Sequence, residues 1–181
     1  MGSGKSTVGK KVARLLGRPF VDSDVALEAR TGRSVATWFA EEGEAGFRAA
    51  EAALLAEQLA GDAALVIGAG GGVVVTAANR LRLAEPDVVA VYLHAEPAFL
   101  ASRVQAKPHR PLLGDDRAEV LARMYAERDP WYREVAGPVI EVRPVLEGEE
   151  KPKWRLAEQV VEALAARGVA DAVVPAQELA R

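Results

Sequence analysis

The chain opens on a short segment that could bind phosphate, with the sequence Gly2-Ser3-Gly4-Lys5-Ser6-Thr7. Glycines allow successive backbone N–H groups to turn toward one anion, and a helix that follows adds the positive end of its dipole. The segment matches the second half of the Walker A motif, in which the lysine reaches the β- and γ-phosphates of a nucleotide and the next hydroxyl binds Mg²⁺. We predict these roles for Lys5 and Ser6. The alternative is a glycine-rich turn before a helix.

Two parts of the complete phosphate-binding unit are not in the sequence. The full motif begins with a glycine five residues before Gly4, which places it ahead of Met1, and a strand should lead into the loop. We expect the natural protein to carry roughly ten or more residues upstream, enough for one strand and the start of the loop. We also expect residues 1–181 alone to aggregate or to fold loosely.

Two carboxylates follow the next predicted strand, at Asp22 and Asp24. Sheets of the α/β class bind ligands at the carboxyl ends of their strands. One carboxylate there could hold Mg²⁺ through water, and the other could accept a proton from an attacking hydroxyl. The alternative is that Asp24 caps a helix and Asp22 is solvated.

A long predicted helix carries Arg48 with Glu51 three residues later, a spacing that also suits an ordinary surface ion pair. Three glycines, Gly70, Gly71 and Gly72, follow a predicted buried strand. Residues without a side chain suit a close approach of the backbone to a ligand, although a flexible turn has the same composition.

A segment bounded by prolines, residues 106–116, contains Arg110 and could close over ATP as a lid that brings a cation to the transferring phosphoryl group. Arg133 follows the aromatic pair Trp131-Tyr132. Each of these arginines, taken singly, fits a solvated surface better than a functional site. The two histidines, His94 and His109, lack the spacing of metal ligands, and we assign them no role.

Apolar runs alternate with helical patterns, which predicts an α/β fold with a parallel sheet. We predict strands over 19–21, 65–67, 88–93 and 139–142, and helices over 6–16, 24–30, 35–41, 44–60, 97–104, 117–128 and 154–166. The length of 181 residues favours one domain, which we place at 1–167, followed by an unassigned tail at 168–181.

The composition excludes several classes of protein. The chain has no cysteine, which rules out a disulfide framework, a thiolate metal site and a cysteine nucleophile. The net charge of −3 gives no support to nucleic-acid binding, and no apolar run is long enough to span a membrane. We expect a cytoplasmic protein, because the absence of cysteine fits a reducing compartment, and we expect a monomer.

From Met1 to about Val142 the sequence resembles the shikimate kinase family. The resemblance rests on an ordered set of motifs: GSGKST, the DSD turn, the pattern TGRS…F…GE..FR..E from Thr31 to Glu51, the GGG after a strand, RPLL at Arg110–Leu113, and Tyr132-Arg133. The family fold is a P-loop fold of three layers, with a parallel sheet of strand order 2-3-1-4-5 flanked by helices. The first strand is absent from this chain, and the segment 143–153 is longer than usual.

The resemblance implies a reaction, the ATP-dependent phosphorylation of the 3-hydroxyl of shikimate, with Mg²⁺ as cofactor. It also implies a role for each matching residue. Asp24 would orient the substrate and act as base, Asp22 would support Mg²⁺ with Ser6, and Lys5 and Arg110 would contact the phosphates. The carboxylate of shikimate would bind Arg48 and Arg133, a bidentate task suited to guanidinium groups. The remaining implied contacts are Glu51 bracing Arg48, Gly70, Gly71 and Gly72 lining the substrate pocket, and Arg103 stacking on adenine.

Two alternatives stay open at this point. Another small-molecule kinase of the same fold, such as a gluconate or nucleoside monophosphate kinase, would share the phosphate loop, although the paired carboxylate-binding arginines argue against it. An inactive, truncated nucleotide-binding module would fit the absent first strand, although Lys5, Asp24 and Arg110 are all present.

Overall fold

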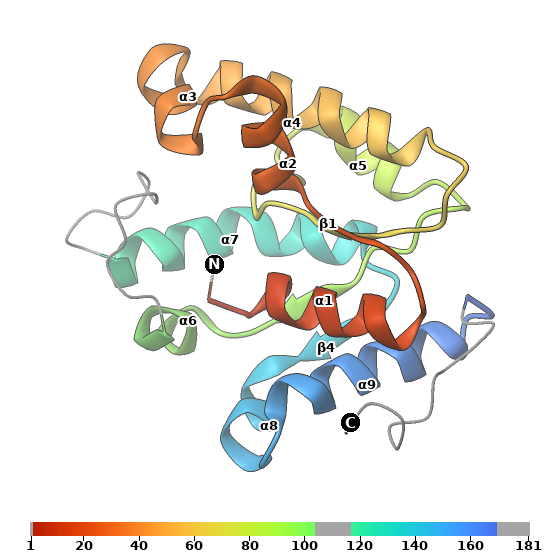
Figure 1. Cartoon of the computed structure of the whole chain (residues 1–181). Helices are drawn as coiled ribbons and strands as arrows, with labels where there is room; N and C mark the ends of the chain where they lie inside the picture. The colour runs from red at the N-terminus through yellow and green to blue at the C-terminus, as the bar shows by residue number, and fades with distance from the viewer. Residues whose placement is uncertain (1, 104–116, 170–181) are drawn as a thin grey trace.

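The computed structural model of the chain describes residues 2–103 and 117–169. The predicted lid at 106–116, with Arg110, and residues 170–181 of the predicted tail lie outside the described residues. Short parallel strands run through the middle of the molecule, and helices cover them (Figure 1).

The strands that the structure describes form two parallel pairs. β1 (Phe20–Asp22) pairs with β2 (Val66–Gly68), and β3 (Tyr92–His94) pairs with β4 (Val139–Glu141). Helical crossovers connect the strands, as expected for parallel pairing. This arrangement agrees with the predicted α/β class. β3 begins later than the predicted strand 88–93, because residues 88–91 form no ladder with another strand of the described residues.

The helices are grouped around these pairs. The first four are α1 (Lys5–Leu15), α2 (Ser23–Thr31), α3 (Val35–Glu41) and α4 (Gly43–Leu59). The remaining five are α5 (Ala77–Leu83), α6 (Pro97–Arg103), α7 (Arg117–Val135), α8 (Val142–Gly148) and α9 (Pro152–Ala165). In Figure 1, α2, α3, α4 and α5 gather at the top, α8 and α9 lie at the bottom, and α1 lies between the two groups.

The structure differs from the predicted helices in three places. α5 was not predicted, α8 occupies part of the segment predicted as a long connection, and α7 continues to Val135 although Pro130 lies inside it. A helix that already has tertiary partners tolerates the hydrogen bond that an internal proline removes.

Local capping fixes where two helices begin. The Asp22 carboxylate accepts a hydrogen bond from the backbone N–H of Asp24, so Asp22 caps α2, and Asp24 lies in its first turn. Ser34 caps α3 in the same manner, as predicted, through the N–H of Thr37. Capping at Asp22 therefore sets the direction in which Asp24 leaves the end of β1.

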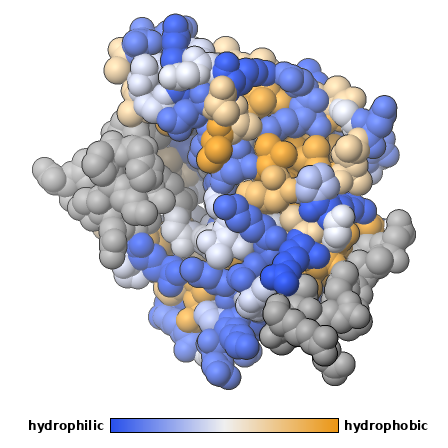
Figure 2. Space-filling model, in the orientation of Figure 1, coloured by the Kyte–Doolittle hydropathy of each residue, from blue (hydrophilic) through white to orange (hydrophobic). Residues whose placement is uncertain are grey.

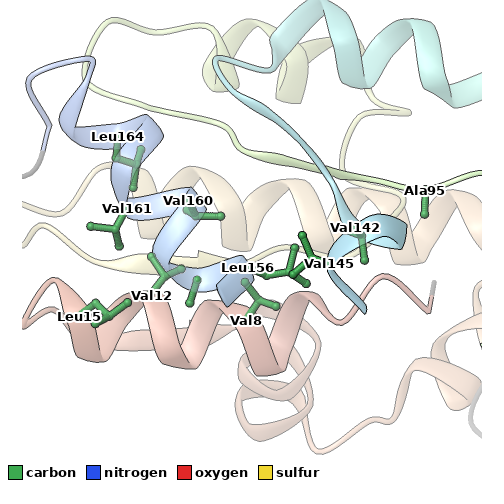
Figure 3. Packing of buried hydrophobic residues seen from close by; sticks show 11 residues of the cluster. Val8, Val12, Leu15, Ala95, Val142, Val145, Leu156, Val160, Val161 and Leu164 are labelled. Carbon is green, nitrogen blue, oxygen red and sulfur yellow. The ribbon is translucent and has the colours of Figure 1, made fainter. Parts of the chain in front are cut away.

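The largest core cluster joins the two ends of the described chain. Val8, Val12 and Leu15 of α1 face Leu156, Val160, Val161 and Leu164 of α9 (Figure 3). Val142 and Val145 of α8 and Ala95 complete the cluster from the side of β3 and β4. Each fully buried side chain of this kind contributes about 1.5–3 kcal/mol to folding, so this interface is a main source of stability.

A cavity of about 790 Å³ separates the two strand pairs. Its walls include β2 with residues 88–93 and, from α1, Val8 and Val12. Hydrophobic residues, in orange, are visible between the α4 region and α1 in the space-filling view (Figure 2). Across the parts of the chain that the structure describes, we find no helix with the length and apolar character needed to span a membrane.

Candidate active site

The phosphate-binding end of the site lies at the N-terminus of α1. Gly4 precedes the helix with a φ of 90°, a conformation that favours glycine. The first N–H groups of α1 have no carbonyl one turn earlier and can donate to an anion. The Nζ atom of Lys5 lies 3.4 Å from the carbonyl oxygen of Gly68 and 3.7 Å from an oxygen of Asp22. The structure thus places the loop lysine at the carboxyl ends of β1 and β2.

The residues predicted to support Mg²⁺ lie in contact. The Ser6 hydroxyl donates a hydrogen bond of 2.6 Å to the Asp22 carboxylate. A hydroxyl and a carboxylate oxygen suit a hard cation, and Mg²⁺ in such sites takes most of its other ligands from phosphates and water. The described residues contain no group of three or more acidic or histidine side chains that could hold a metal. The donor set therefore fits a cation that arrives with a nucleotide.

The glycine run packs directly against α2 and α4. A methyl group at Gly70 would lie 2.6 Å from Oε1 of Glu51 and 3.1 Å from Oδ1 of Asp24, and one at Gly72 would overlap the guanidinium of Arg48. None of Gly70, Gly71 and Gly72 has a positive φ. A side chain at Gly70 or Gly72 would displace the polar ends of Glu51, Asp24 or Arg48, so glycine at these positions keeps those groups in place.

Arg48 is held from two sides on α4. Its Nη1 donates to Glu51 at 2.8 Å, while Nε and Nη2 donate to Glu44 at 3.2 and 3.1 Å. These bonds use three of the five N–H groups of the guanidinium. Two N–H groups of Arg48 therefore remain for a ligand, and guanidinium groups commonly bind carboxylates. The contact with Glu51 agrees with the predicted brace, whereas Glu44 was not predicted.

Glu51 is itself buried, with 5% of its surface exposed. Burial raises the pKa of its carboxyl above the usual value, and the neighbouring Arg48 opposes this rise. Its Oε1 atom is buried without a hydrogen-bond partner among the described residues. A buried acceptor of this kind beside Asp24 and Gly70 is suited to a hydroxyl donor from a ligand.

A second guanidinium reaches the glycine run from α7, and sequence analysis did not single it out. Arg128 is 8% exposed, its Nη1 lies 3.4 Å from the carbonyl oxygen of Gly71, and its Nε is buried without a partner in the described structure. Tyr132, one turn later, donates its hydroxyl to the same carbonyl. Arg128 contacts Gly71, and Arg48 lies beside Gly72, so the two guanidinium groups lie at adjacent positions of the glycine run.

Arg133 lies elsewhere. Its Nε donates to Asp129 at 2.7 Å, and 47% of the side chain is exposed. Residues 128 and 133 are five positions apart, which is about 140° around a helix at 3.6 residues per turn. Only one of them can face the glycine run, and the structure brings Arg128 there. The spacing of Arg128 and Tyr132, one turn apart on one helix face, is the signal that could have identified this arginine.

Arg103, at the end of α6, lies beside the start of the phosphate loop. Its Nε donates to the carbonyl oxygen of Gly2 at 3.3 Å, and its guanidinium lies over the ring of Phe99 at 5.5 Å. This position is compatible with the predicted contact to a nucleotide base.

One short piece of chain connects the two ends of the site. Gly68, which contacts Lys5, is followed two residues later by Gly70, which contacts Asp24 and Glu51. A group bound by the two arginines would thus lie near an anion bound by Lys5. A phosphate loop, carboxylates at strand ends and a guanidinium pocket on an α/β fold define a P-loop kinase that acts on a small anionic substrate.

Residues 1–167 match the family model described as "Shikimate kinase". The chain belongs to the shikimate kinase family. It is 51% identical over 142 residues to a shikimate kinase of Halorhodospira halophila, covering 78% of this chain and 79% of the relative. It is 48% identical over 150 residues to a shikimate kinase of Burkholderia pseudomallei, covering 82% of this chain and 80% of the relative.

Solved structures agree with this placement. The shikimate kinase from Acinetobacter baumannii in complex with shikimate superposes with a TM-score of 0.83 at 36% identity, covering 92% of this chain and 89% of that one. The shikimate kinase from Bacteroides thetaiotaomicron has a TM-score of 0.79 at 29% identity, covering 91% of this chain and 94% of that one. The family predicted from the motifs is therefore confirmed.

Proposed function

We propose that this chain transfers the γ-phosphoryl group of ATP to the 3-hydroxyl of shikimate, giving shikimate 3-phosphate and ADP. The observation that carries the proposal is the segment from Gly68 to Gly72, which contacts Lys5 at one end and the guanidinium pocket at the other. That pocket suits a small ring with one carboxylate and several hydroxyls. We also propose that the enzyme is a monomer in the cytoplasm, and the absence of cysteine is compatible with that compartment.

Each side chain has a distinct part in the proposed reaction. Arg48 and Arg128 bind the substrate carboxylate, and Glu51 holds Arg48 in place. Asp24 orients the hydroxyl and accepts its proton as the hydroxyl oxygen bonds to the γ-phosphorus, while the bond between that phosphorus and the bridging oxygen of ADP breaks. Lys5 neutralises charge on the phosphates.

Mg²⁺ would be held by Ser6, through its hydroxyl, and by Asp22, and it would offset the charge of the phosphate oxygens. Arg110 and Arg103 complete the proposed nucleotide site, Arg110 as a cation of the lid and Arg103 beside the base. Thr7 and the N–H groups of Gly2, Ser3 and Gly4 belong to the same phosphate cradle.

The proposal is tested by following ADP release in an extended chain, in which an apolar strand and the first glycine of the Walker motif are fused before Gly2. We expect ADP from ATP and Mg²⁺ only when shikimate is added, because the acceptor hydroxyl completes the site. A panel containing gluconate and nucleoside monophosphates separates the remaining small-molecule kinases. Turnover with one of these and none with shikimate would refute the proposal.

A second measurement concerns the arginine pair. Replacing Arg48 or Arg128 by lysine keeps the charge but removes the planar fork, so we expect the KM for shikimate to rise by about tenfold or more while the KM for ATP changes little. Arg123→Lys, at an exposed position on α7, is the matched control.

Arg133→Lys tests the assignment made from the sequence. A larger rise in the KM for shikimate at Arg133 than at Arg128 would return the carboxylate contact to Arg133. A rise in the KM for ATP alone would place Arg48 and Arg128 in the nucleotide site instead.

A further inference from the structure

Tyr92, on β3, joins two separate faces of α7. Its ring stacks on that of Tyr132, with centroids 4.8 Å apart and planes inclined by 27°, and its hydroxyl donates to Oδ1 of Asp129 at 3.1 Å. One side chain from the strand thus contacts the face of α7 that points to the glycine run and the adjacent face.

Asp129 is the point where α7 is held to the end of the strand. Its Oδ2 accepts from Nε of Arg133 at 2.7 Å, its Oδ1 lies 3.9 Å from Nε2 of His94, and its side chain is only 16% exposed. The next residue, Pro130, lies inside α7 and lacks an N–H, which removes the bond that the carbonyl of Ala126 would otherwise accept. Where a backbone hydrogen bond of a helix is missing, contacts of its side chains have more influence on the orientation of the helix.

The neighbouring face of α7 carries the pocket residues. Arg128 and Tyr132 both direct a polar group at the carbonyl oxygen of Gly71. A small rotation of α7 about its axis would move both groups together, away from the glycine run and from Arg48. The stacking contact with Tyr92 and the hydrogen bond to Asp129 oppose such a rotation from two directions.

We propose that Tyr92 and Asp129 are positioning residues for shikimate binding: they fix the rotation of α7 and so hold Arg128 and Tyr132 against Gly71. The inference rests on the proposed function, since the pocket it positions is the one assigned to the carboxylate of shikimate. Tyr92 and Asp129 contact each other and the α7 residues Tyr132 and Arg133, so both act on the pocket through α7.

The protonation of Tyr92 is compatible with this role. Burial raises the pKa of its hydroxyl far above the usual value, and the negative charge of Asp129 raises it further. Tyr92 therefore stays protonated and remains a donor to Asp129 throughout the pH range of an enzyme assay.

The test compares two substitutions that each delete one hydroxyl from the same network. Tyr92→Phe keeps the stacked ring and removes the bond to Asp129. Tyr125→Phe is the matched control, because its hydroxyl lies on the same helix but bonds Nε2 of His94 at 2.9 Å. Both substitutions are made in the extended chain described under the proposed function, and the KM for shikimate, the KM for ATP, kcat and the melting temperature are measured.

We expect Tyr92→Phe to raise the KM for shikimate by about five- to twentyfold, with kcat and the KM for ATP within about twofold of the parent values. Tyr125→Phe should change the KM for shikimate by less than about twofold, although the melting temperatures of the two variants fall by similar amounts. Asp129→Ala should reproduce the effect of Tyr92→Phe, and Asp129→Asn, which retains an acceptor for Tyr92, should recover most of the affinity.

Equal changes in the KM for shikimate from Tyr92→Phe and Tyr125→Phe would overturn the inference. A parallel loss of kcat and of both affinities in Tyr92→Phe would also overturn it, because that pattern indicates a general loss of structure. Failure of the proposed function has a different signature, the absence of shikimate-dependent ADP release from the parent protein before any substitution is made.

Discussion

Fusing an apolar β-strand before Gly2 is expected to raise the melting temperature of the chain by at least about 10 °C and to increase its shikimate kinase activity. The space for such a strand is the cavity of about 790 Å³ between β2 and β3. α1 lies along this cavity through Val8 and Val12, so a strand that leads into Gly2 and then reverses into α1 would run beside β2 and β3 in a parallel sense.

The expected size of this effect follows from the groups that line the cavity. A strand paired on both edges satisfies backbone groups that each cost about 1–3 kcal/mol when they are buried unpaired. Each apolar side chain that it buries adds about 1.5–3 kcal/mol. Together these terms are comparable with the whole stability of a typical domain, about 5–15 kcal/mol.

A matched control separates strand pairing from simple lengthening. The same added sequence with two residues changed to proline has nearly the same size but cannot complete the hydrogen-bond ladder. Thermal melting and ADP release are compared for residues 1–181 and for the two extended chains. An equal gain from both extensions, or a cooperative melt and full activity from residues 1–181 alone, would contradict the prediction.

Asp24→Asn is expected to lower kcat by about 100-fold or more, because an amide cannot accept the proton of the attacking hydroxyl. Lys5→Ala should lower kcat by a similar factor, because the positive charge beside the phosphates is removed. The reduced rate is measured at saturating ATP and shikimate in the extended chain, so that kcat is separated from binding.

The control for this pair is Asp62→Asn, an identical chemical change at an exposed residue of the loop after α4. It should leave kcat unchanged. Near-parental turnover in Asp24→Asn would remove the assignment of Asp24 as base, and a loss of ATP affinity without a loss of kcat in Lys5→Ala would limit that lysine to binding.

Residues close together in the sequence were the most predictable part of the structure. The turn before α1, the positions of Asp22 and Asp24 at the end of β1, and the pair Arg48 and Glu51 all depend on local spacing. Helix α5 was missed because it spans only seven residues, Ala77–Leu83, and the segments on either side show no clear hydrophobic periodicity. The long connection predicted over 143–153 contains α8, whose burial of Val142 and Val145 depends on contacts with distant helices.

The difference between Arg128 and Arg133 shows what the sequence could not predict about the residues of the site. Both arginines lie on one helix, and the sequence alone does not say which face of α7 meets the glycine run. That choice depends on the contact between Tyr132 and Gly71, which are 61 positions apart. A motif identifies the position of a residue in the sequence. The packing of the helix determines whether the side chain at that position points into the pocket.

The packing of α1 against α9 has a consequence for how the protein is made. Val8 and Val12 are buried by Leu156 and Val160, which are synthesised 148 residues later. Because synthesis proceeds at about 5–20 residues per second, the apolar face of α1 remains uncovered for several seconds before α9 is made. The nascent chain therefore exposes an apolar surface until α9 has been synthesised, and we expect the yield of folded protein to depend on chaperones and on the rate of elongation.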